Sequence, residues 1–250
     1  MRPTVAVLIP ALNEAATLPG LLTALAQSRA DRVIVVDNGS TDATSEVARA
    51  HGATVVSEPE RGYGAACLAG IAQLASQDHP DVLVFLDADH AEGPRQIEAL
   101  VQPILSGEAD LTLGLRVRDH NRFGTAFVHA RLGNRIVLAL VRVLFGHRFD
   151  DLPPFRAVRF DRLLELGMDD RNWGWTLQMQ IRAAQRGLRI VTVPVEHGKR
   201  RAGRSKISGS VLGTLRAGSK MFYTLARERW RAARGRGRST TRGGGAPTRD

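Results

Sequence analysis

The chain has 250 residues, of which 43% are hydrophobic, and it carries a formal net charge of +10. Its single cysteine, Cys67, excludes an intramolecular disulfide and a multi-cysteine zinc site. The charge is concentrated at one end, because residues 199–250 hold 15 Lys and Arg against two acidic residues, which leaves −3 for the rest. This division argues against a body that binds nucleic acid and indicates a basic appendage on a mildly acidic domain.

Neither a signal peptide nor a membrane span is expected. Met1-Arg-Pro runs directly into a strand pattern without an apolar leader region, and no apolar run approaches the ~20 residues that a spanning helix needs. We therefore expect a cytoplasmic protein, with a basic C-terminus available for peripheral contact with the anionic inner face of the membrane.

Strand and helix patterns alternate through the first half of the chain. Such alternation predicts an α/β fold with a mostly parallel sheet covered by helices on both faces. The apolar runs predict buried strands at residues 4–9, 32–36, 53–57, 82–86 and 111–115, and apolar spacing predicts helices at about 18–25, 65–75 and 94–105.

Two carboxylates, Asp87 and Asp89, directly follow the strand at 82–86. Parallel sheets bind ligands beyond the carboxyl ends of their strands, and two close carboxylates at such an edge are costly without a cation between them. Mg²⁺ typically takes one or two protein carboxylates and completes its shell with water and phosphate oxygens. The sequence therefore predicts a divalent metal, Mg²⁺ or Mn²⁺, that holds a diphosphate; the alternative is two solvated loop aspartates.

Other polar residues follow strands at the same predicted edge. Asp37 is placed to accept a hydrogen bond from a ribose or base, although it could also be only a turn residue. Arg61, in a glycine-containing loop before a helix, suits a phosphate, with an ordinary surface arginine as the alternative. The convergence of Glu14, Asp37, Asp87 and Asp89 on one edge is the strongest indication that they form a single site.

The alternation stops after Arg116. Residues 136–145 are apolar apart from Arg142, which favours a core helix, with contact to a membrane surface or lipid acceptor as the alternative. A further helix is predicted at 176–186 and a strand at 188–193. His197 follows that strand and could reach a metal or phosphate at the same edge.

The last fifth of the chain begins with a basic loop. Arg204, Ser205 and Lys206 supply the cations and hydroxyl that clamping a diphosphate needs, although an ordinary basic linker would look the same. Residues 207–230 predict an amphipathic helix, and residues 231–250 predict a disordered basic tail.

Seven short motifs follow one another along the chain: IPALNEA (9–15), VVDNGSTDAT (35–44), ERGYGAA (60–66), FLDADH (85–90), LGLR (113–116), LPPFRAVR (152–159) and GRSKISGS (203–210). This order is typical of glycosyltransferase family 2, which the chain resembles over most of residues 3 to about 225. The nearest branch resembles the polyprenyl- and dolichyl-phosphate sugar synthases and their soluble relatives.

This resemblance implies a GT-A fold and a metal-dependent, inverting transfer of a sugar from a nucleotide-diphosphate sugar, UDP- or GDP-linked. The acceptor is unknown, with polyprenyl phosphate as one candidate. Asp87 and Asp89 would bear the metal, Asp89 as the direct and catalytic ligand, with His197 as a further metal candidate. The implied nucleotide and donor contacts are Pro10, Asn13, Glu14, Asp37, Gly39, Arg61, Gly62, Asp87, Arg204, Ser205 and Lys206.

Two departures from the family pattern bear on the chemistry. Pro153 stands where the family motif leads us to expect glycine, and Gln178 where the family usually has glutamate. An amide cannot act as a general base. Either that position is not the base in this branch, or the acceptor needs none, or activity is reduced; Asp151 is the remaining carboxylate candidate for catalysis.

The resemblance also suggests how the chain is divided. Residues 1–118 form the nucleotide-sugar-binding half and 119–206 the acceptor-side half of one GT-A domain, followed by the helix and the tail. Two other functions stay open: a sugar nucleotidyltransferase, and a non-catalytic nucleotide-sugar-binding relative, which Gln178 motivates. The first usually has a Gly- and Arg-rich loop after strand one, where this chain has Pro10-Ala-Leu-Asn-Glu14.

Overall fold

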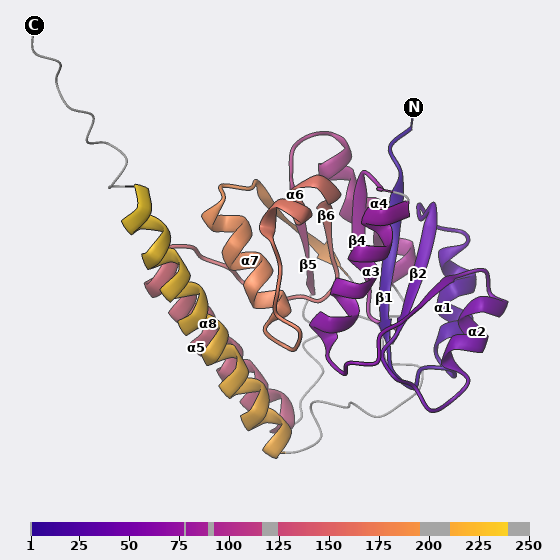
Figure 1. Ribbon diagram of the computed structural model, residues 1–250, viewed down its shortest axis with the longest axis horizontal. Helices are drawn as coiled ribbons and strands as arrows, with labels where there is room; N and C mark the ends of the chain where they lie inside the picture. Colours follow the sequence, from indigo (N-terminus) through magenta and orange to yellow (C-terminus); the bar gives the residue numbers. More distant parts are fainter. Residues whose placement is uncertain (1, 78, 90–92, 117–124, 196–210, 240–250) are drawn as a thin grey trace, which may run out of the picture.

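The structure is a computed structural model that describes residues 2–77, 79–89, 93–116, 125–195 and 211–239 (Figure 1). Its centre is a seven-stranded sheet in the order β3-β2-β1-β4-β6-β5-β7. All strand pairs are parallel except those of β6, which runs antiparallel to both β4 and β5. The strands are β1 Val5–Ala11, β2 Arg32–Asp37, β3 Thr54–Ser57, β4 Val82–Phe85, β5 Leu111–Arg116, β6 Arg156–Arg159 and β7 Ile190–Val195.

Helices cover both faces of the sheet, as predicted. Alternate residues of β1 point to opposite sides: Val7 packs in a cluster with α1, α2 and α4, and Leu8 in a cluster with α3, α6 and α7. Both side chains are completely buried, which explains the continuous apolar pattern of this strand. The helices are α1 Leu18–Leu25, α2 Thr44–Ala50, α3 Tyr63–Gln77, α4 Gly93–Leu105, α5 Thr125–Phe145, α6 Phe160–Leu166, α7 Trp175–Gln185 and α8 Val211–Ser239.

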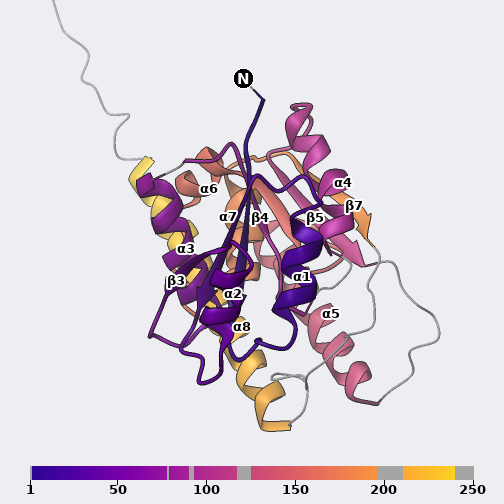
Figure 2. The ribbon, with the colours of Figure 1, turned by 90° about the vertical axis from the view of Figure 1, so that its right-hand side faces the viewer.

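A third layer lies outside α7. Figures 1 and 2 show α5 and α8 side by side along the part of the molecule remote from β2 and β3. Their inner faces meet α7 in a separate apolar cluster that includes Val141, Ile181 and Leu225. The predicted core helix at 136–145 is therefore present, but it begins at Thr125. Among the described helices, none is both long and apolar enough to cross a membrane.

The contact between α7 and α8 contains a buried ion pair. Arg182 is 6% exposed, and its Nε and Nη2 each donate to one carboxylate oxygen of Glu228 at 2.9 Å. Glu228 itself is 2% exposed. Because a lone buried charge is costly, this bidentate geometry links the position of α8 to that of α7.

The prediction that residues 231–250 are disordered is wrong for residues 231–239, because α8 continues to Ser239. Arg231 pairs with Asp169 at 2.6 Å, and the Arg234 guanidinium lies 3.7 Å from the centre of the Trp230 ring. Arginine also has a high helix propensity. The contacts and this propensity together account for a helix that continues past its predicted end. Residues 240–250 lie outside the described residues.

Candidate active site

The carboxyl ends of the parallel strands form one edge of the sheet, here called the ligand edge. Asp37, the last residue of β2, pairs in register with Ala11, the last residue of β1. β4 is parallel to β1, so Asp87 and Asp89 lie just beyond the same edge. β6 runs the other way, so the loop before Arg156 also meets this edge. The structure therefore brings these carboxylates to one edge, as predicted.

The loop after β1 is pinned to the loop after β2. Asn13 has a φ of 52°, a left-handed conformation that asparagine tolerates better than most residues. Its backbone N–H donates to Ser40 Oγ at 2.9 Å, and its Oδ1 accepts from Thr41 N at 2.8 Å. The backbone N–H of Glu14 donates to the buried Thr44 hydroxyl at 2.9 Å. Residues from two strand ends thus hold each other in place at the ligand edge.

Asp37 is half-buried and hydrogen-bonded on both carboxylate oxygens. Oδ1 accepts from Ser40 N at 2.9 Å, and Oδ2 accepts from Ser45 Oγ. Burial raises the pKa of this carboxyl, but the hydrogen bonds from Ser40 and Ser45 outweigh it, so the net pKa lies below its ordinary value. Asp37 is therefore ionised at neutral pH and helps to build the loop. A carboxylate has about four acceptor sites, so these bonds leave capacity for a ligand.

Asn38 ties the loop after β2 to the loop before α3. It is 6% exposed; its Nδ2 donates to the carbonyls of Glu58 at 2.9 Å and Glu60 at 2.7 Å, and its Oδ1 accepts from Gly62 N at 2.8 Å. Asn38 is not among the site residues predicted from the sequence, where an asparagine before glycine indicates only a tight turn. Its place between Asp37 and Gly39, directly after a buried strand, was the available signal.

The glycine loop before α3 packs closely against residues 170–172. A Cβ on Gly62 would lie 2.1 Å from the carbonyl oxygen of Arg171, and the φ of Gly62 is 156°. The amides of Gly64 and Ala65 donate to the carbonyls of Asn172 and Arg171 at 3.2 and 2.9 Å. These two amides at the start of the helix are thus paired with protein rather than free for a phosphate.

Arg61 is exposed, and its Nη2 donates to the carbonyl oxygen of Gly39 at 3.1 Å. Gly39 has a φ of 81°, a conformation that favours glycine in this turn. The two residues bring the loop after β2 and the loop before α3 together at the ligand edge. Arg61 therefore has an exposed guanidinium beside the loop that Asp37 organises.

Asp87 and Asp89 are both half-buried beyond β4. Their carboxylates are hard oxygen donors, which fit Mg²⁺ or Mn²⁺. The described ranges contain no group of three His, Cys, Asp or Glu side chains that could hold an ion. A metal on this pair would therefore draw its other ligands from water, phosphate oxygens or residues outside those ranges. Burial raises the pKa of the nearby Cys67 well above its ordinary value, and the charge of Asp87 raises it further, so Cys67 is an un-ionised thiol.

A completely buried arginine, Arg156, lies behind this pair. Its Nη1 donates to the carbonyl of Thr176 at 3.1 Å, and its Nη2 to the carbonyl of Pro153. Burial lowers its pKa to about 10, with the charges of Asp87 and Asp151 opposing the shift, so the guanidinium stays protonated at neutral pH. Nε is buried without a hydrogen-bond partner in the described part of the chain.

Arg156 is not among the site residues predicted from the sequence. The signal was present, because the residue lies between apolar neighbours in the motif FRAV, where a charge needs buried partners. The structure also shows what Pro153 does in place of the expected glycine. Its side chain is buried and its carbonyl accepts from Arg156, so this departure forms part of the support for the loop.

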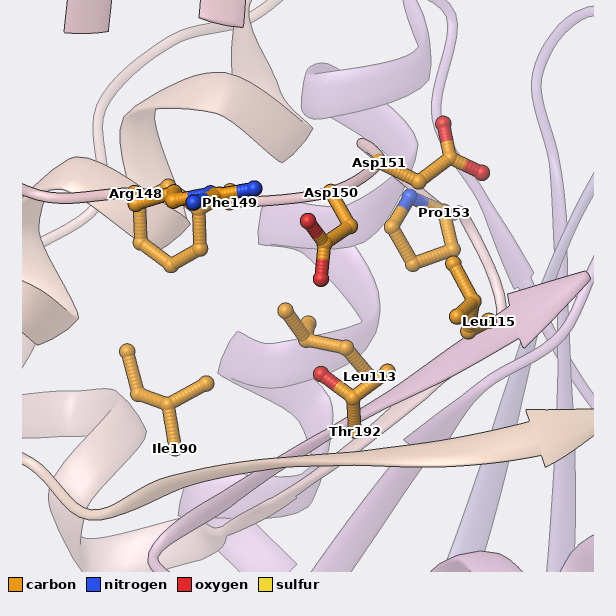
Figure 3. Close-up of a pocket in the computed structure, with 9 residues that line it drawn as sticks. All are labelled: Leu113, Leu115, Arg148, Phe149, Asp150, Asp151, Pro153, Ile190 and Thr192. Atoms are coloured by element: carbon orange, nitrogen blue, oxygen red, sulfur yellow. The ribbon is translucent and has the colours of Figure 1, made fainter. Parts of the chain in front are cut away.

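A cavity of about 110 Å³ lies between this loop and strands β5 and β7. Figure 3 shows the Asp150 carboxylate directed toward the space above Leu113, whereas Asp151 lies beyond Pro153 with its carboxylate turned away. Asp151 Oδ1 accepts from Asn134 Nδ2 at 3.0 Å and from Leu152 N at 2.8 Å. The catalytic role of Asp151 stays a prediction, and Asp150 is the member of the pair that faces the cavity.

Gln178 lies in the protein interior, where its side chain is hydrogen-bonded to other parts of the chain. It is completely buried in α7, and its Oε1 accepts from the backbone amides of Asp169 and Asp170 at 3.1 and 3.0 Å. Its Nε2 donates to Asp169 Oδ1 and Glu228 Oε1, each at 2.8 Å. The amide therefore uses both of its donors and both acceptor sites in the α7–α8 contact. Of the three readings of this departure, the structure favours the first: this position is not the base in this chain.

Four further predicted site residues fall outside the described residues. They are His197, Arg204, Ser205 and Lys206, all between β7 and α8.

Comparisons with known proteins agree with this geometry. An uncharacterized glycosyltransferase of Mycobacterium tuberculosis is 37% identical over 215 residues, covering 84% of this chain and 93% of the relative. An undecaprenyl-phosphate mannosyltransferase of Micrococcus luteus is 30% identical over 217 residues, covering 82% of this chain and 88% of the relative.

Among solved structures, the chain resembles glucosyl-3-phosphoglycerate synthase of Mycobacterium tuberculosis in complex with Mn²⁺, UDP and glucosyl-3-phosphoglycerate. The TM-score is 0.71 at 26% identity, covering 91% of this chain and 80% of the other. Residues 6–167 match the sequence profile of glycosyl transferase family 2, and this span includes the strand-end loops described above. The chain therefore belongs to glycosyl transferase family 2, has the GT-A fold, and is a glycosyltransferase.

Proposed function

We propose that this glycosyltransferase moves a sugar, with inversion, from a UDP- or GDP-linked donor to a polyprenyl phosphate in a metal-dependent reaction. The observation that carries the proposal is the placement of Asp37, Asp87 and Asp89, with their loops, at one edge of the sheet of a family 2 enzyme. The relative that acts on undecaprenyl phosphate and the structural neighbour that binds Mn²⁺ and UDP support the acceptor and donor classes.

In this proposal the donor's nucleotide lies along the loops after β1 and β2. Pro10, Asn13 and Glu14 come from the first loop, and Asp37 and Gly39 from the second. The donor's diphosphate lies near Arg61 and Gly62, and Arg204, Ser205 and Lys206 supply the cations and hydroxyl that bind it. Asp87 and Asp89 hold the divalent metal, with His197 as a further candidate ligand. When bound, the metal neutralises the negative charge that develops on the departing diphosphate.

A phosphate acceptor removes the need for a general base. An oxygen of the acceptor phosphate attacks the anomeric carbon while the bond from that carbon to the donor diphosphate breaks, and the nucleoside diphosphate leaves. The attacking oxygen is already ionised at neutral pH, so no proton has to be removed. Asp151, or Asp150 at the cavity, would matter as a base only for an acceptor that attacks through a hydroxyl.

The first test is nucleotide binding measured by thermal unfolding. UDP, GDP, CDP and dTDP are each added with and without Mn²⁺, because a ligand that binds only the native state raises the unfolding temperature. A metal-dependent rise for UDP or GDP is expected, and Asp89→Asn should abolish its metal dependence. Asp161→Asn is the matched control, because Asp161 lies exposed near the opposite end of β6.

Acceptor choice is then tested with the donor that the binding panel identifies. Transfer to polyprenyl phosphate with release of nucleoside diphosphate is expected. Transfer to 3-phosphoglycerate alone would contradict the lipid acceptor while leaving the donor assignment intact. Pyrophosphate release from a nucleoside triphosphate and a sugar phosphate would instead support the nucleotidyltransferase alternative. Nucleotide binding without transfer to any acceptor or donor hydrolysis would support the non-catalytic one.

A lipid-linked acceptor also requires the enzyme to work at a membrane. We propose a cytoplasmic enzyme that contacts the inner face peripherally, for which the +13 balance of residues 199–250 supplies attraction to anionic lipid.

A further inference from the structure

The outward side of the α5–α8 pair is unusually rich in exposed apolar side chains. The described part of the chain has six exposed large hydrophobic side chains, of which Leu164 on α6 is the only one on another element. The other five are Ile136 (45% exposed) and Val143 (79%) on α5, and Phe222 (49%), Tyr223 (61%) and Trp230 (54%) on α8.

These five side chains are not the ones that hold the two helices to the body. α5 packs inward through Val137 and Val141, and α8 packs inward through Leu225. On α5, Ile136 and Val143 are seven residues apart and so share one side of the helix, away from the buried positions. The apolar residues therefore lie on the outer sides of the two helices, which the described part of the chain leaves uncovered.

The charges on this face have one sign. Within residues 133–145 and 219–234, Glu228 is the only acidic residue, and it is buried against Arg182. The exposed charged side chains in these two ranges are all basic. Two aromatic rings are paired with arginines: Arg234 lies over Trp230 at 3.7 Å and Arg227 over Tyr223 at 5.9 Å. We call this surface the α5–α8 outer face; its residues are Arg135, Ile136, Arg142, Val143, Phe222, Tyr223, Arg229, Trp230 and Arg234.

We propose that the α5–α8 outer face docks on an anionic lipid bilayer. Aromatic and aliphatic side chains enter the headgroup region of a membrane, and arginines beside them pair with lipid phosphates. The two helices lie side by side on the part of the molecule away from β2 and β3, so both can meet one plane (Figures 1 and 2). The proposal deepens the lipid-phosphate function proposed above and rests on it for its purpose.

Two other occupants fit this face less well. A second copy in a symmetric dimer would bring identical basic surfaces together, and like charges across an interface are repulsive. Single-stranded nucleic acid favours aromatic rings on which bases stack, whereas Ile136 and Val143 offer no such ring. A bilayer uses the aliphatic, aromatic and basic side chains together.

The test measures sedimentation of the full-length chain with vesicles that contain no acceptor and no donor. Binding is expected to phosphatidylcholine vesicles that contain phosphatidylglycerol, and to be much weaker without it. Two double variants are compared with the wild type, one with Phe222→Ser and Trp230→Ser and the other with Arg229→Glu and Arg234→Glu. Each should lower the partition coefficient by about tenfold or more.

Two matched variants separate this face from general surface effects and from the C-terminal tail. The first is a double variant that changes an exposed leucine on α6 (Leu164→Ser) and an exposed arginine on α4 (Arg95→Glu). Its vesicle binding should equal that of the wild type. Arg242→Glu with Arg249→Glu makes the same charge change outside the described residues, and its effect should be smaller than that of the helix variant. Circular dichroism and the nucleotide thermal shift confirm that each variant is folded and binds donor.

Trp230 reports on depth directly. Brominated lipid in the vesicles should quench the fluorescence of the wild-type chain, and Trp230→Phe should remove most of the quenching. The other two tryptophans are not part of this face: Trp175 is buried at 1% exposure, and Trp173 is half-buried in the loop before α7. The proposal is overturned by absent vesicle binding, by equal binding of the helix variants and wild type, or by a loss confined to the tail variant. Dimer formation that the Trp230→Ser variant abolishes would also overturn it. A retained nucleotide shift would leave the donor assignment standing in each case.

Discussion

Asn38 and Arg156 support the ligand edge from beneath, and neither is a predicted substrate contact. Asn38 joins two loops through three hydrogen bonds, and Arg156 joins the loop before β6 to the start of α7. Both are buried, so each removed hydrogen bond would leave a polar backbone group without water to replace it. At the scale of single residues, the site therefore depends on buried donors as well as on its carboxylates.

Replacing Asn38 with alanine is expected to lower the free energy of unfolding by about 1–3 kcal/mol, because two carbonyls and one amide lose their partner. Nucleotide affinity should fall with it, since the loops of Asp37 and Arg61 lose their link. Urea unfolding and the UDP or GDP thermal shift measure the two effects. Gln73→Ala is the control: its side chain bonds to Gln77 on the exposed side of α3, and a comparable loss there would contradict the prediction.

The Arg156→Met variant removes a buried cation and leaves the carbonyls of Pro153 and Thr176 unpaired. We expect the free energy of unfolding to drop by about 2–4 kcal/mol, measured by urea unfolding. Arg156→Lys keeps the charge but lacks the planar fork, so it should recover only part of the stability. Full recovery by lysine would show that charge alone matters at this position.

The element scale is illustrated by the contact between α7 and α8. Gln178, Arg182 and Glu228 form one connected hydrogen-bond network, and Asp169 joins it from the loop before α7. The same loop continues to residues 171 and 172, whose carbonyls accept from the start of α3. The network therefore connects the C-terminal helix with the loop that carries Arg61 and Gly62.

Replacing Arg182 with leucine should lower the free energy of unfolding by about 3 kcal/mol, because it removes the bidentate partner of the buried Glu228. Of its ion pairs within the described residues, Glu228 then keeps only the longer ones with Arg227 and Arg231, at 3.7 and 3.5 Å. The control is Arg162→Leu, which breaks the pair with Glu165 on the surface of α6, where both side chains are about half exposed. That change should cost less than about 1 kcal/mol. Urea unfolding measures both losses of stability. Equal losses in the two variants would show that the buried ion pair between α7 and α8 stabilises the protein no more than an exposed pair does.

The whole molecule should lose stability in acid through specific carboxylates. Hydrogen bonds from Arg189 lower the pKa of Asp110 to about 2. Burial raises the pKa of Asp169, but hydrogen bonds from Arg231 and Gln178 outweigh it and bring the pKa to about 2. Both folded pKa values lie below the ordinary value of 3.8. Their stabilisation is therefore complete above pH ~4 and is lost as the pH falls towards 2.

Free energies of unfolding measured from pH 5 to pH 2 test this expectation. Asp110→Asn should be less stable than wild type at neutral pH, yet its stability should fall less steeply between pH ~4 and 2. The reason is that the asparagine amide does not titrate, so acid has no carboxylate to protonate beside Arg189. Parallel curves for variant and wild type would show that the ion pair does not contribute to acid sensitivity.

The sequence by itself determined the alternation of strands and helices, and with it the edge where Asp37, Asp87 and Asp89 meet. These are local properties, because an apolar run is buried away from water, whereas the polar residues that end it stay at the surface. The family motifs added the enzyme class, which the match over residues 6–167 confirms. Metal binding and the individual contacts of the site residues stay predictions.

The tertiary structure decided which partners the buried polar groups find. Pairing between β4 and β5 through an antiparallel β6, the burial of Gln178 against Glu228 and the extension of α8 to Ser239 each depend on residues far apart in the chain. The choice between Asp150 and Asp151 at the cavity depends on how one loop lies against β5 and β7. A pattern shows that a side chain is buried, but only the folded chain supplies the group that satisfies it.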